Sequence, residues 1–306
     1  MHRGRFVFSS SEDLTRASEA KGTARSSALA LWLTSAAENL FATLFPADCR
    51  LCGQPLTKIS RLPVCQTCLA AIHPIEGGRC VVCGERILSP HAVAQAAADG
   101  QRCILCRRVE PPFLRAVSYG SYEGGLRELI HLLKYEQVRS AIGVLGRMLA
   151  MAIGDLQPEF SDAEICVLPV PLHRRKLRQR GFNQSELIAY KALTFLPEKT
   201  RWALHKDVLV RQKLTQSQIG LTGHQRRENL RGAFVVTKPE IIFGREVILV
   251  DDVFTTGTTV SECARILRRN GASNVWVATV ARTLKAHTKS VQSVGSDDAR
   301  LTSARA

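Results

Sequence analysis

The chain has 306 residues, of which 45% are hydrophobic and 23% charged, so it is neither wholly disordered nor a coiled coil and can form a packed core. At about 150 residues for each domain, this length predicts about two domains. Lys and Arg number 42 against 27 Asp and Glu, and the resulting net charge of +15 favours anionic partners. Nucleic acid, phosphorylated metabolites and an acidic membrane surface all fit that charge.

The N-terminal region, residues 1–45, is expected to form a tail and an amphipathic helix that lies on the protein or on a membrane surface. Its apolar stretch, residues 28–45, is interrupted by polar side chains and so lacks the roughly 18 uninterrupted apolar residues that span a bilayer. No secretory cleavage site follows a compact apolar run. We therefore expect a cytoplasmic protein without a transmembrane segment. Residues 286–306 are expected to form a disordered tail.

Four C-x-x-C pairs occupy residues 46–110 and account for eight of the ten cysteines. Two such pairs complete a closed tetrahedral zinc site, so the segment predicts two structural zinc ions and a double zinc ribbon. Sequential pairing, first with second and third with fourth, needs only short hairpins. The expected zinc ligands are Cys49, Cys52, Cys65, Cys68, Cys80, Cys83, Cys103 and Cys106.

Two other interpretations of the cysteine pairs are weaker. A disulfide framework requires an oxidising compartment. No export signal is visible in the sequence, so we expect reduced cysteines. A redox role suits one C-x-x-C pair better than four. Closed four-cysteine sites leave no open coordination position, so the zinc is expected to be structural. Its removal should unfold residues 49–106 and leave the remainder folded.

From residue 111 to residue 285, short β-prone runs alternate with helical periodicity. Strands are expected at residues 116–122, 165–170, 247–250 and 275–280. This alternation predicts an α/β domain with a mostly parallel sheet and helices on both faces. Ligands of such sheets bind beyond the carboxyl ends of the strands, so the functional residues are expected there.

The strand at 247–250 is followed by Asp251, Asp252 and a threonine-rich loop that opens a helical pattern. Free N–H groups and the positive dipole end of a helix favour a phosphate. Two alternatives stay open. A Walker B strand would need a G-x-x-x-x-G-K-[ST] segment, which the chain lacks; the threonines could also be an ordinary helix cap beside solvated aspartates. The loop residues expected to bind phosphate are Thr255, Thr256, Gly257, Thr258 and Thr259.

An apolar strand, two acids and then T-G-x-T resemble the signature of type I phosphoribosyltransferases. In that family the acids hold the ribose hydroxyls of phosphoribosyl pyrophosphate and the loop holds its 5′-phosphate. Together with the cysteine pairs, Y-G-S-Y-E-G at 119–124, H-L-L-K-Y at 131–135, V-P-L-H-R-R at 170–175 and R-G-F-N-Q at 180–184 look like the ComF family. The resemblance covers roughly residues 40–284. It implies a type I phosphoribosyltransferase-like domain, Mg²⁺ with the substrate, and a link to natural competence.

The middle of the chain is strongly basic. Residues 172–232 hold 14 Lys and Arg against four Asp and Glu. The resemblance places a pyrophosphate-binding loop after the strand at 165–170 and a flexible hood at 211–230. Arg pairs bidentately with phosphate. The basic residues expected to bind substrate are Arg174, Arg175, Lys176, Arg180, Arg226 and Arg227.

Two functions are therefore expected to compete for this basic region. The first is a phosphoribosyltransferase-like protein that binds phosphoribosyl pyrophosphate and, with Mg²⁺, displaces pyrophosphate toward an unspecified acceptor in DNA uptake or use. The second is a non-catalytic adaptor that binds single-stranded DNA and other competence proteins. Aromatic residues make up only 6% of the chain, so stacking platforms for bases are scarce. Thr255 stands where base-using transferases commonly carry an acid, which argues against ordinary purine salvage.

Overall fold

The computed structural model describes residues 47–56, 61–87, 100–161, 163–198, 201–213 and 223–284. The tail and helix expected for residues 1–45 and the tail expected for 286–306 lie outside these ranges. The chain divides into two compact units, residues 1–64 and 65–306. The ribbon boundary near residue 110 stays a prediction. No helix in the described ranges is long and apolar enough to cross a membrane.

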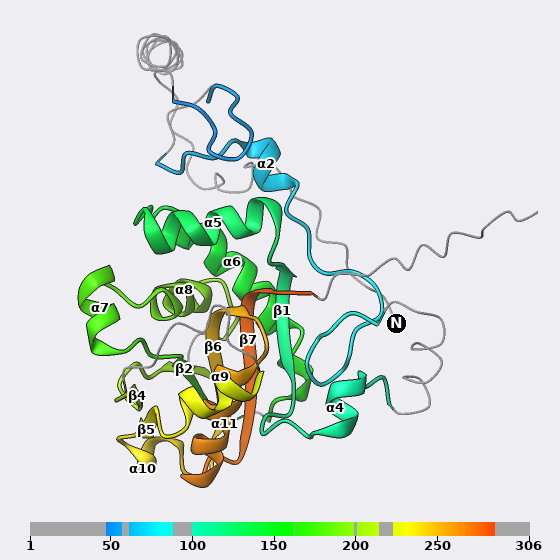
Figure 1. Cartoon of the computed structure of the whole chain (residues 1–306), viewed down its shortest axis with the longest axis vertical. Helices are drawn as coiled ribbons and strands as arrows, with labels where there is room; N and C mark the ends of the chain where they lie inside the picture. Colours follow the sequence, from blue (N-terminus) through cyan, green and yellow to red (C-terminus); the bar gives the residue numbers. More distant parts are fainter. Residues whose placement is uncertain are drawn as a thin grey trace, which may run out of the picture. The chain divides into compact units, whose positions relative to one another are not determined.

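Five parallel strands form the central sheet, in the order β1-β7-β6-β2-β3, as the α/β pattern predicted (Figure 1). Both faces of β2 and β7 are covered, which explains why their sequences are almost continuously apolar. A separate antiparallel pair is made by β4 and β5. The strands are β1 (Ala116–Ser121), β2 (Ile165–Pro169), β3 (Trp202–Leu204), β4 (Leu209–Arg211), β5 (Phe234–Val236), β6 (Glu246–Phe254) and β7 (Asn274–Arg282).

Helices cover both faces of the sheet. In β6, Val247 and Leu249 belong to the core cluster that includes Leu267 of α11. Because side chains alternate along a strand, Ile248 and Val250 face the opposite side, where α6 and α8 pack. The helices are α2 (Gln66–Ala70), α4 (Ile104–Arg108), α5 (Gly124–Tyr135), α6 (Ala141–Gly154), α7 (Arg174–Arg180), α8 (Gln184–Leu193), α9 (Gly223–Leu230), α10 (Pro239–Ile242) and α11 (Thr258–Arg269), with a 3₁₀ turn, η1, at Gln157–Glu159.

The strands β2 and β6 are parallel neighbours in the sheet, and the direction in which the chain adds its next strand reverses between them. The chain leaves β2 through α8 to reach β3 on one side, and it leaves β6 through α11 to reach β7 on the other. Right-handed crossovers that run in opposite directions place their helices on opposite faces of the sheet. The loops after β2 and β6 therefore part at the carboxyl edge, where α/β sheets bind ligands.

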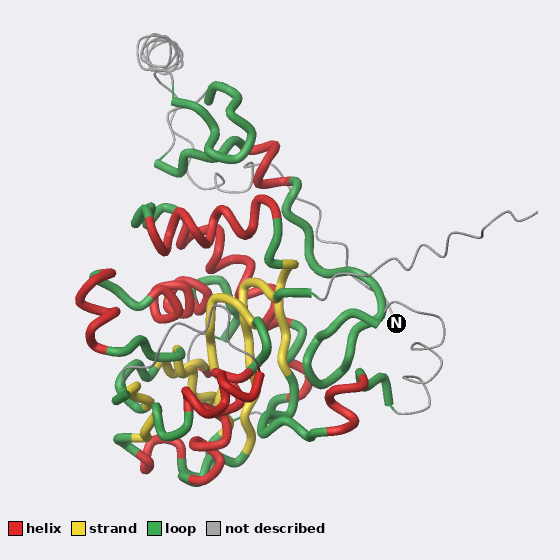
Figure 2. Tube along the Cα trace, in the orientation of Figure 1, coloured by secondary structure: helices red, strands yellow, loops and turns green. Residues whose placement is uncertain are grey.

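The region predicted as a hood, residues 211–230, is partly described. Residues 214–222 lie outside the described ranges, and the segment that follows forms α9, which packs against α11. The predicted basic loop after β2 is also helical at its centre, since Arg174–Arg180 form α7 (Figure 2). A His173 N-cap and Gly181 in the left-handed conformation bound this helix, so a run of basic residues between a cap and a glycine gives a helix and not a loop.

Candidate ligand site and cysteine groups

The eight paired cysteines form two groups of four, and the sulfur atoms within each group lie within 4.8 Å of one another. The first group comprises Cys49, Cys52, Cys65 and Cys68, and the second Cys80, Cys83, Cys103 and Cys106, so the expected sequential pairing is confirmed. A tetrahedral zinc ion with Zn–S bonds of about 2.3 Å separates its sulfurs by about 3.8 Å. The sulfurs of Cys83 and Cys103 are 3.7 Å apart. Both groups are consistent with structural zinc sites.

The second cysteine group is built into the unit that contains the sheet. Cys80 and Cys106 belong to the core cluster of the sheet, and the carbonyl of Val82 accepts a 2.7 Å hydrogen bond from the N–H of Ala116, where β1 begins. A tight turn at Gly84 makes this approach possible, because a Cβ there would lie 3.2 Å from the carbonyl oxygen of Ala116. The knuckle, by which we mean the turn of residues 80–85 that carries the third C-x-x-C pair, therefore folds together with β1.

Arg282, at the end of β7, joins the same knuckle to the end of β6. Its side chain is 3% exposed, pairs with Glu85 at 2.8 Å and donates to the carbonyl of Cys83. Its guanidinium also lies 4.8 Å from the ring centroid of Phe254. A Cβ on Gly257 would lie 2.6 Å from Cζ of that ring, so Phe254 supports the threonine loop directly.

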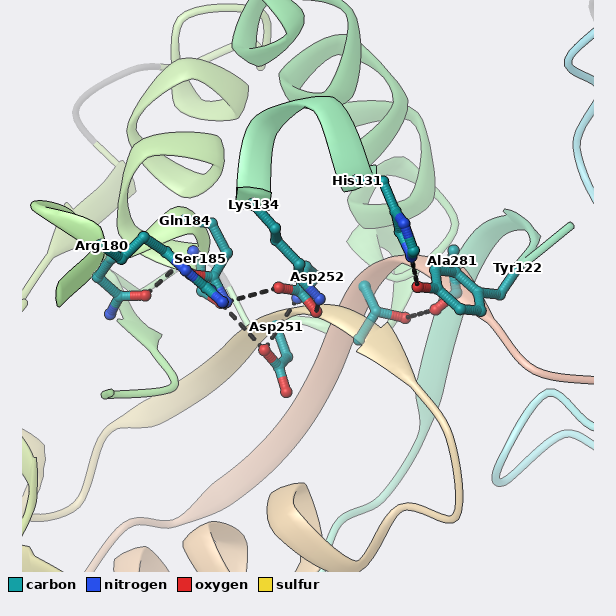
Figure 3. A network of polar contacts seen from close by, with 11 residues as sticks. Tyr122, His131, Lys134, Arg180, Gln184, Ser185, Asp251, Asp252 and Ala281 are labelled. Atoms are coloured by element: carbon teal, nitrogen blue, oxygen red, sulfur yellow. Dashed lines mark hydrogen bonds and ion pairs between the residues drawn. The ribbon is translucent and has the colours of Figure 1, made fainter. Parts of the chain in front are cut away.

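The acid pair lies inside a strand and not after it. The prediction ended this strand at residue 250, but β6 continues to Phe254 and carries Asp251 and Asp252 in its ladder with β7 (Figure 3). Successive residues of a strand point to opposite faces. Asp252, 5% exposed, therefore points to the face where α8 packs, whereas Asp251 is half-buried and has the orientation of the α11 face.

Both carboxylate oxygens of Asp252 have partners. Nζ of Lys134, at the end of α5, lies 2.8 Å from Oδ1, and Nε2 of Gln184 donates a 2.7 Å hydrogen bond to Oδ2. Arg180 in turn donates to Oε1 of Gln184 at 2.6 Å. Burial lowers the pKa of Lys134, but the charges of Asp252 and Asp251 outweigh it and the pKa is raised. Lys134 is therefore a fixed cation inside the acid site.

Asp251 is held at one oxygen only. Its Oδ1 accepts hydrogen bonds from the hydroxyl of Ser185 at 3.0 Å and from the N–H of Asp252 at 2.9 Å. Among the described residues, Oδ2 has no hydrogen-bond partner. Burial, reinforced by the charge of Asp252, raises the pKa of Asp251 to about 7. This carboxyl group therefore keeps one open oxygen at the carboxyl edge and changes its charge near neutral pH.

The start of α8 fixes the partners of the acid pair. Asn183 caps the helix by accepting a 3.1 Å bond from the N–H of Ser185, and its Nδ2 donates to the carbonyl of Val170 at 3.1 Å. One amide thus ties the first turn of α8 to the end of β2. Gln184 and Ser185 follow directly and reach the two acids from there.

The threonine loop turns from β6 into α11. Gly257 has a φ of 74°, in the left-handed region that favours glycine, and it precedes the first helical residue, Thr258. The hydroxyls of Thr256 and Thr258 are 2.8 Å apart. Thr255 and Thr256 are exposed, while Thr258 and Thr259 are half-buried. The five predicted loop residues are thus brought together at the N-terminus of a 12-residue helix.

The predicted basic residues fall in two helices. Arg174, Arg175, Lys176 and Arg180 lie in α7, while Arg226 and Arg227 lie in α9, where their side chains are outside the described part. Burial and the nearby charges of Arg211, Arg180 and Lys134 lower the pKa of Lys176. Lys176 and Arg180 therefore lie near Lys134, the partner of Asp252.

Three polar residues of this site received no role from the sequence: Lys134, Gln184 and Ser185. The first two lie in the H-L-L-K-Y and R-G-F-N-Q motifs, so a signal was present. Their partners could not be identified, because Lys134 and Asp252 are more than one hundred residues apart and meet only through the sheet order. Ser185 carried no separate signal.

Known relatives span most of the chain. It is 31% identical over 243 residues to DNA utilization protein YhgH of Escherichia coli K12, covering 78% of this chain and 98% of that protein. It is also 31% identical over 228 residues to competence protein F of Haemophilus influenzae, covering 71% and 96%. The chain belongs to the ComF family. Competence protein ComFC of Bacillus subtilis, another member, is 26% identical over 211 residues, covering 68% and 79%.

The domain comparison agrees with the sheet topology. Residues 203–295 match the family model of the phosphoribosyl transferase domain. Among solved structures, an allosteric regulatory enzyme of purine biosynthesis matches at 24% identity over 46% of this chain and 26% of that one, with a TM-score of 0.28. A hypoxanthine-guanine phosphoribosyltransferase of Schistosoma mansoni matches at 15% identity over 47% and 57%, with a TM-score of 0.26.

Proposed function

We propose that this ComF protein binds phosphoribosyl pyrophosphate, or a related ribose phosphate, at the carboxyl edge between β2 and β6. The observation that supports this most is that acidic, hydroxyl-bearing and basic side chains all follow or end the neighbouring strands β2 and β6, where the strand order reverses. An acid pair lies in the last four residues of β6, a threonine loop opens α11, and a basic helix, α7, follows the neighbouring strand. Carboxylates accept hydrogen bonds from sugar hydroxyls, whereas helix N-termini and Arg bind phosphate.

Each part of the ligand has its own place in this proposal. The 5′-phosphate lies against the loop from Thr255 to Thr259, where N–H groups at the start of α11 and threonine hydroxyls donate hydrogen bonds. The ribose hydroxyls donate hydrogen bonds to the aspartate carboxylates near the carboxyl end of β6. The pyrophosphate lies toward the cations, which are Arg174, Arg175, Lys176 and Arg180 of α7 and Arg226 and Arg227 of α9.

The proposed reaction is displacement at C1 of the ribose. The bond from C1 to pyrophosphate breaks with its electron pair on the leaving oxygen, and a lone pair of the acceptor forms the new bond at C1. The carboxylate of Asp251 stabilises the oxocarbenium-like transition state, and the cations of α7 stabilise the leaving group. Mg²⁺, when bound with the substrate, offsets further negative charge on pyrophosphate. Asp251, with one open oxygen among the described residues, is the acid that would contribute a ligand to Mg²⁺.

Calorimetry of the zinc-loaded full chain with phosphoribosyl pyrophosphate and Mg²⁺ tests this function. We expect saturable binding that Asp251→Asn weakens at least tenfold. Glu164→Gln is the matched control, because Glu164 is a carboxylate just before β2, at the opposite edge of the sheet, paired with Arg245. No binding by the unaltered protein contradicts the proposal, as does equal loss in both variants.

A second candidate is a single-stranded-DNA-binding adaptor that works with competence proteins in the cytoplasm. The exposed basic helix α7 and the names of the relatives, which refer to DNA utilization and competence, favour it. Such binding weakens steeply with salt, because Lys and Arg release counterions from phosphates. An oligonucleotide affinity with a steep salt slope, together with no affinity for phosphoribosyl pyrophosphate, selects this candidate.

A further inference from the structure

A buried arginine ends β7. Arg282 is 3% exposed and is the only charged residue of the strand Asn274–Arg282. Its guanidinium donates to the carbonyl of Cys83 and pairs with Glu85 at 2.8 Å, so both of these partners lie in the knuckle. Replacing a buried ion pair by apolar side chains of similar volume is often neutral or stabilising. Stability alone therefore does not explain an arginine at this position.

The guanidinium of Arg282 also contacts one aromatic ring. Arg282 and Phe254 are paired residues in the ladder of β7 and β6, and the cation lies 4.8 Å from the ring centroid. The ring of Phe113 packs edge-to-face against Phe254, with 6.3 Å between the centroids. Phe254 itself is 5% exposed. These two contacts therefore leave the Phe254 ring little freedom to tilt.

The edge of the Phe254 ring lies against the threonine loop. A Cβ on Gly257 would lie 2.6 Å from Cζ and 3.1 Å from Cε1 of the ring, so the backbone of the loop packs directly on the ring. Gly257 has a φ of 74°, and its carbonyl accepts a 2.8 Å hydrogen bond from the N–H of Ser261 in α11. The ring therefore sets the position of the loop and of the first turn of the helix.

We propose that Arg282 and Phe254 are positioning residues of the ligand site and that they hold the threonine loop in place from the knuckle. This inference rests on the proposed function, in which the loop binds the 5′-phosphate. Both side chains are buried, so neither contacts the ligand. Arg282, fixed by the knuckle, orients Phe254, and Phe254 supports the backbone of Gly257. The donors of the loop are then preorganised for the phosphate, which lowers the cost of binding.

Two ligands separate an effect on the loop from a general loss of structure. In the proposed site, ribose 5-phosphate binds through the threonine loop and pyrophosphate through the cations of α7. We expect Arg282→Met to bind ribose 5-phosphate about tenfold more weakly and pyrophosphate within about twofold of the unaltered protein. Calorimetry of the zinc-loaded full chain with Mg²⁺ measures both. An unchanged affinity for ribose 5-phosphate overturns the inference, as does equal weakening of both ligands.

Ile165→Val is the control for lost stability. Ile165 is fully buried at the start of β2, at the edge of the sheet opposite the threonine loop. Removing one methyl group there should lower the melting temperature and leave both affinities within about twofold. If this variant loses as much affinity for ribose 5-phosphate as Arg282→Met, stability and not the position of the loop determines binding, and the inference is wrong.

A double variant tests whether Arg282 acts through Phe254. Phe254→Leu keeps an apolar side chain but removes the ring edge beside Gly257, so we expect about tenfold weaker binding of ribose 5-phosphate. If Arg282 acts by orienting the ring, adding Arg282→Met to Phe254→Leu should weaken binding by less than about twofold more. Losses that multiply in the double variant overturn this link.

Glu85→Ala keeps the inference testable if Arg282→Met does not fold. It leaves Arg282 in place but removes one of its two partners in the knuckle, so ribose 5-phosphate should bind about threefold more weakly. Glu76→Ala is the matched control, because Glu76 is an exposed carboxylate shortly before the knuckle. Equal affinities of the two variants for ribose 5-phosphate overturn the role of the knuckle.

The two proposals fail in different ways. If the unaltered protein binds neither ribose 5-phosphate nor phosphoribosyl pyrophosphate, the proposed function is wrong, and the positioning role is wrong with it. If the unaltered protein binds and Arg282→Met binds equally well, the function stands and the positioning role is wrong.

Discussion

The second cysteine group and the acid pair solve the same electrostatic problem in different ways. Each gathers side chains that repel one another when ionised: four thiolates in one region and two carboxylates in the other. The sulfur geometry fits a cation taken from solution, a zinc ion that all four ligands enclose. The carboxylates have a cation that belongs to the chain, since Lys134 contacts Asp252 at 2.8 Å.

This difference separates structure from function. A four-cysteine zinc site has no open position, so it can stabilise the fold but cannot take a substrate. The acid pair, with Lys134 on one carboxylate, leaves an oxygen of the other open at the carboxyl edge. The first region should therefore respond to metal removal through stability, and the second should respond to ligand and pH.

Loss of zinc from the second cysteine group should have the largest effect. Structural zinc contributes about 10–16 kcal/mol per site in model peptides. Cys106 lies in the core of the sheet, so Cys106→Ser should release one zinc ion and lower the unfolding temperature reported by Trp276, buried in β7. This sharpens the prediction from sequence, in which zinc loss spares the sheet.

The matched variant is Cys52→Ser in the first group, where Cys52 is exposed. It should also release one zinc ion, but with a smaller change in the Trp276 transition. Zinc is counted by a chromogenic chelator, and unfolding is followed by tryptophan fluorescence. Equal transitions in the two variants would remove the distinction between the cysteine groups.

Replacing Arg282 tests how the two regions are joined. Arg282→Met removes the ion pair with the half-buried Glu85 and the ring contact with Phe254, so we expect a loss of about 1–3 kcal/mol in the free energy of unfolding. Arg127→Met is the control, because Arg127 is exposed and should change stability by less than about 0.5 kcal/mol. Urea unfolding measures both. Similar small losses would show that the ion pair does not join the regions.

The acid pair should make stability depend on pH. Burial raises the pKa of Asp251 to about 7, so the folded protein holds this proton more tightly than the unfolded chain does. The stability from this group is full below the unfolded pKa and is lost as pH rises through about 7. Relative to Asp251→Asn, the unaltered protein should lose about 3 kcal/mol of stability between pH 5 and pH 8, since one pKa unit is about 1.4 kcal/mol and about two units lie between pH 5 and the folded pKa. Urea unfolding at both pH values checks this, and parallel pH dependence in the two proteins would contradict it.

The threonine loop provides the smallest test. Gly257→Ala places a Cβ 2.6 Å from Phe254 at a φ of 74°, so the loop must move and the affinity for ribose 5-phosphate should fall about tenfold, or about 1.4 kcal/mol. Gly244→Ala is matched, with a φ of 69° but nothing within 4 Å of the new Cβ. It should alter stability slightly and affinity not at all. Calorimetry measures both affinities, and equal affinities of the two variants would show that the threonine loop does not bind the ligand.

Local patterns in the sequence predicted much of this molecule. Alternating apolar runs indicated the parallel sheet, and C-x-x-C spacing indicated the four-sulfur groups. The short segments between the pairs favoured sequential pairing but did not establish it. The predicted end of β6, at residue 250, was wrong, because aspartate is rare in strands and the partners of these aspartates on α5 and α8 are distant in sequence. The basic run was predicted as a loop but forms helix α7, because His173 caps its start and Gly181 ends it.

The roles of Lys134, Gln184 and Arg282 could not be predicted, since each depends on a contact across the sheet. A lysine in a helical motif looks like any solvated surface charge until its buried acid partner is known. An arginine at the end of an apolar strand likewise gives no sign of the knuckle that it contacts. Long-range partners, and not residue types, were the missing information.

A crystal structure of the protein with ribose 5-phosphate tests the central claim most directly. We predict the phosphate against the N–H groups of Thr256 to Thr259, with the ribose hydroxyls donating to the aspartate carboxylates near the carboxyl end of β6. A sugar bound elsewhere, or a crevice whose carboxylates remain without a ligand at saturating concentration, would contradict the account.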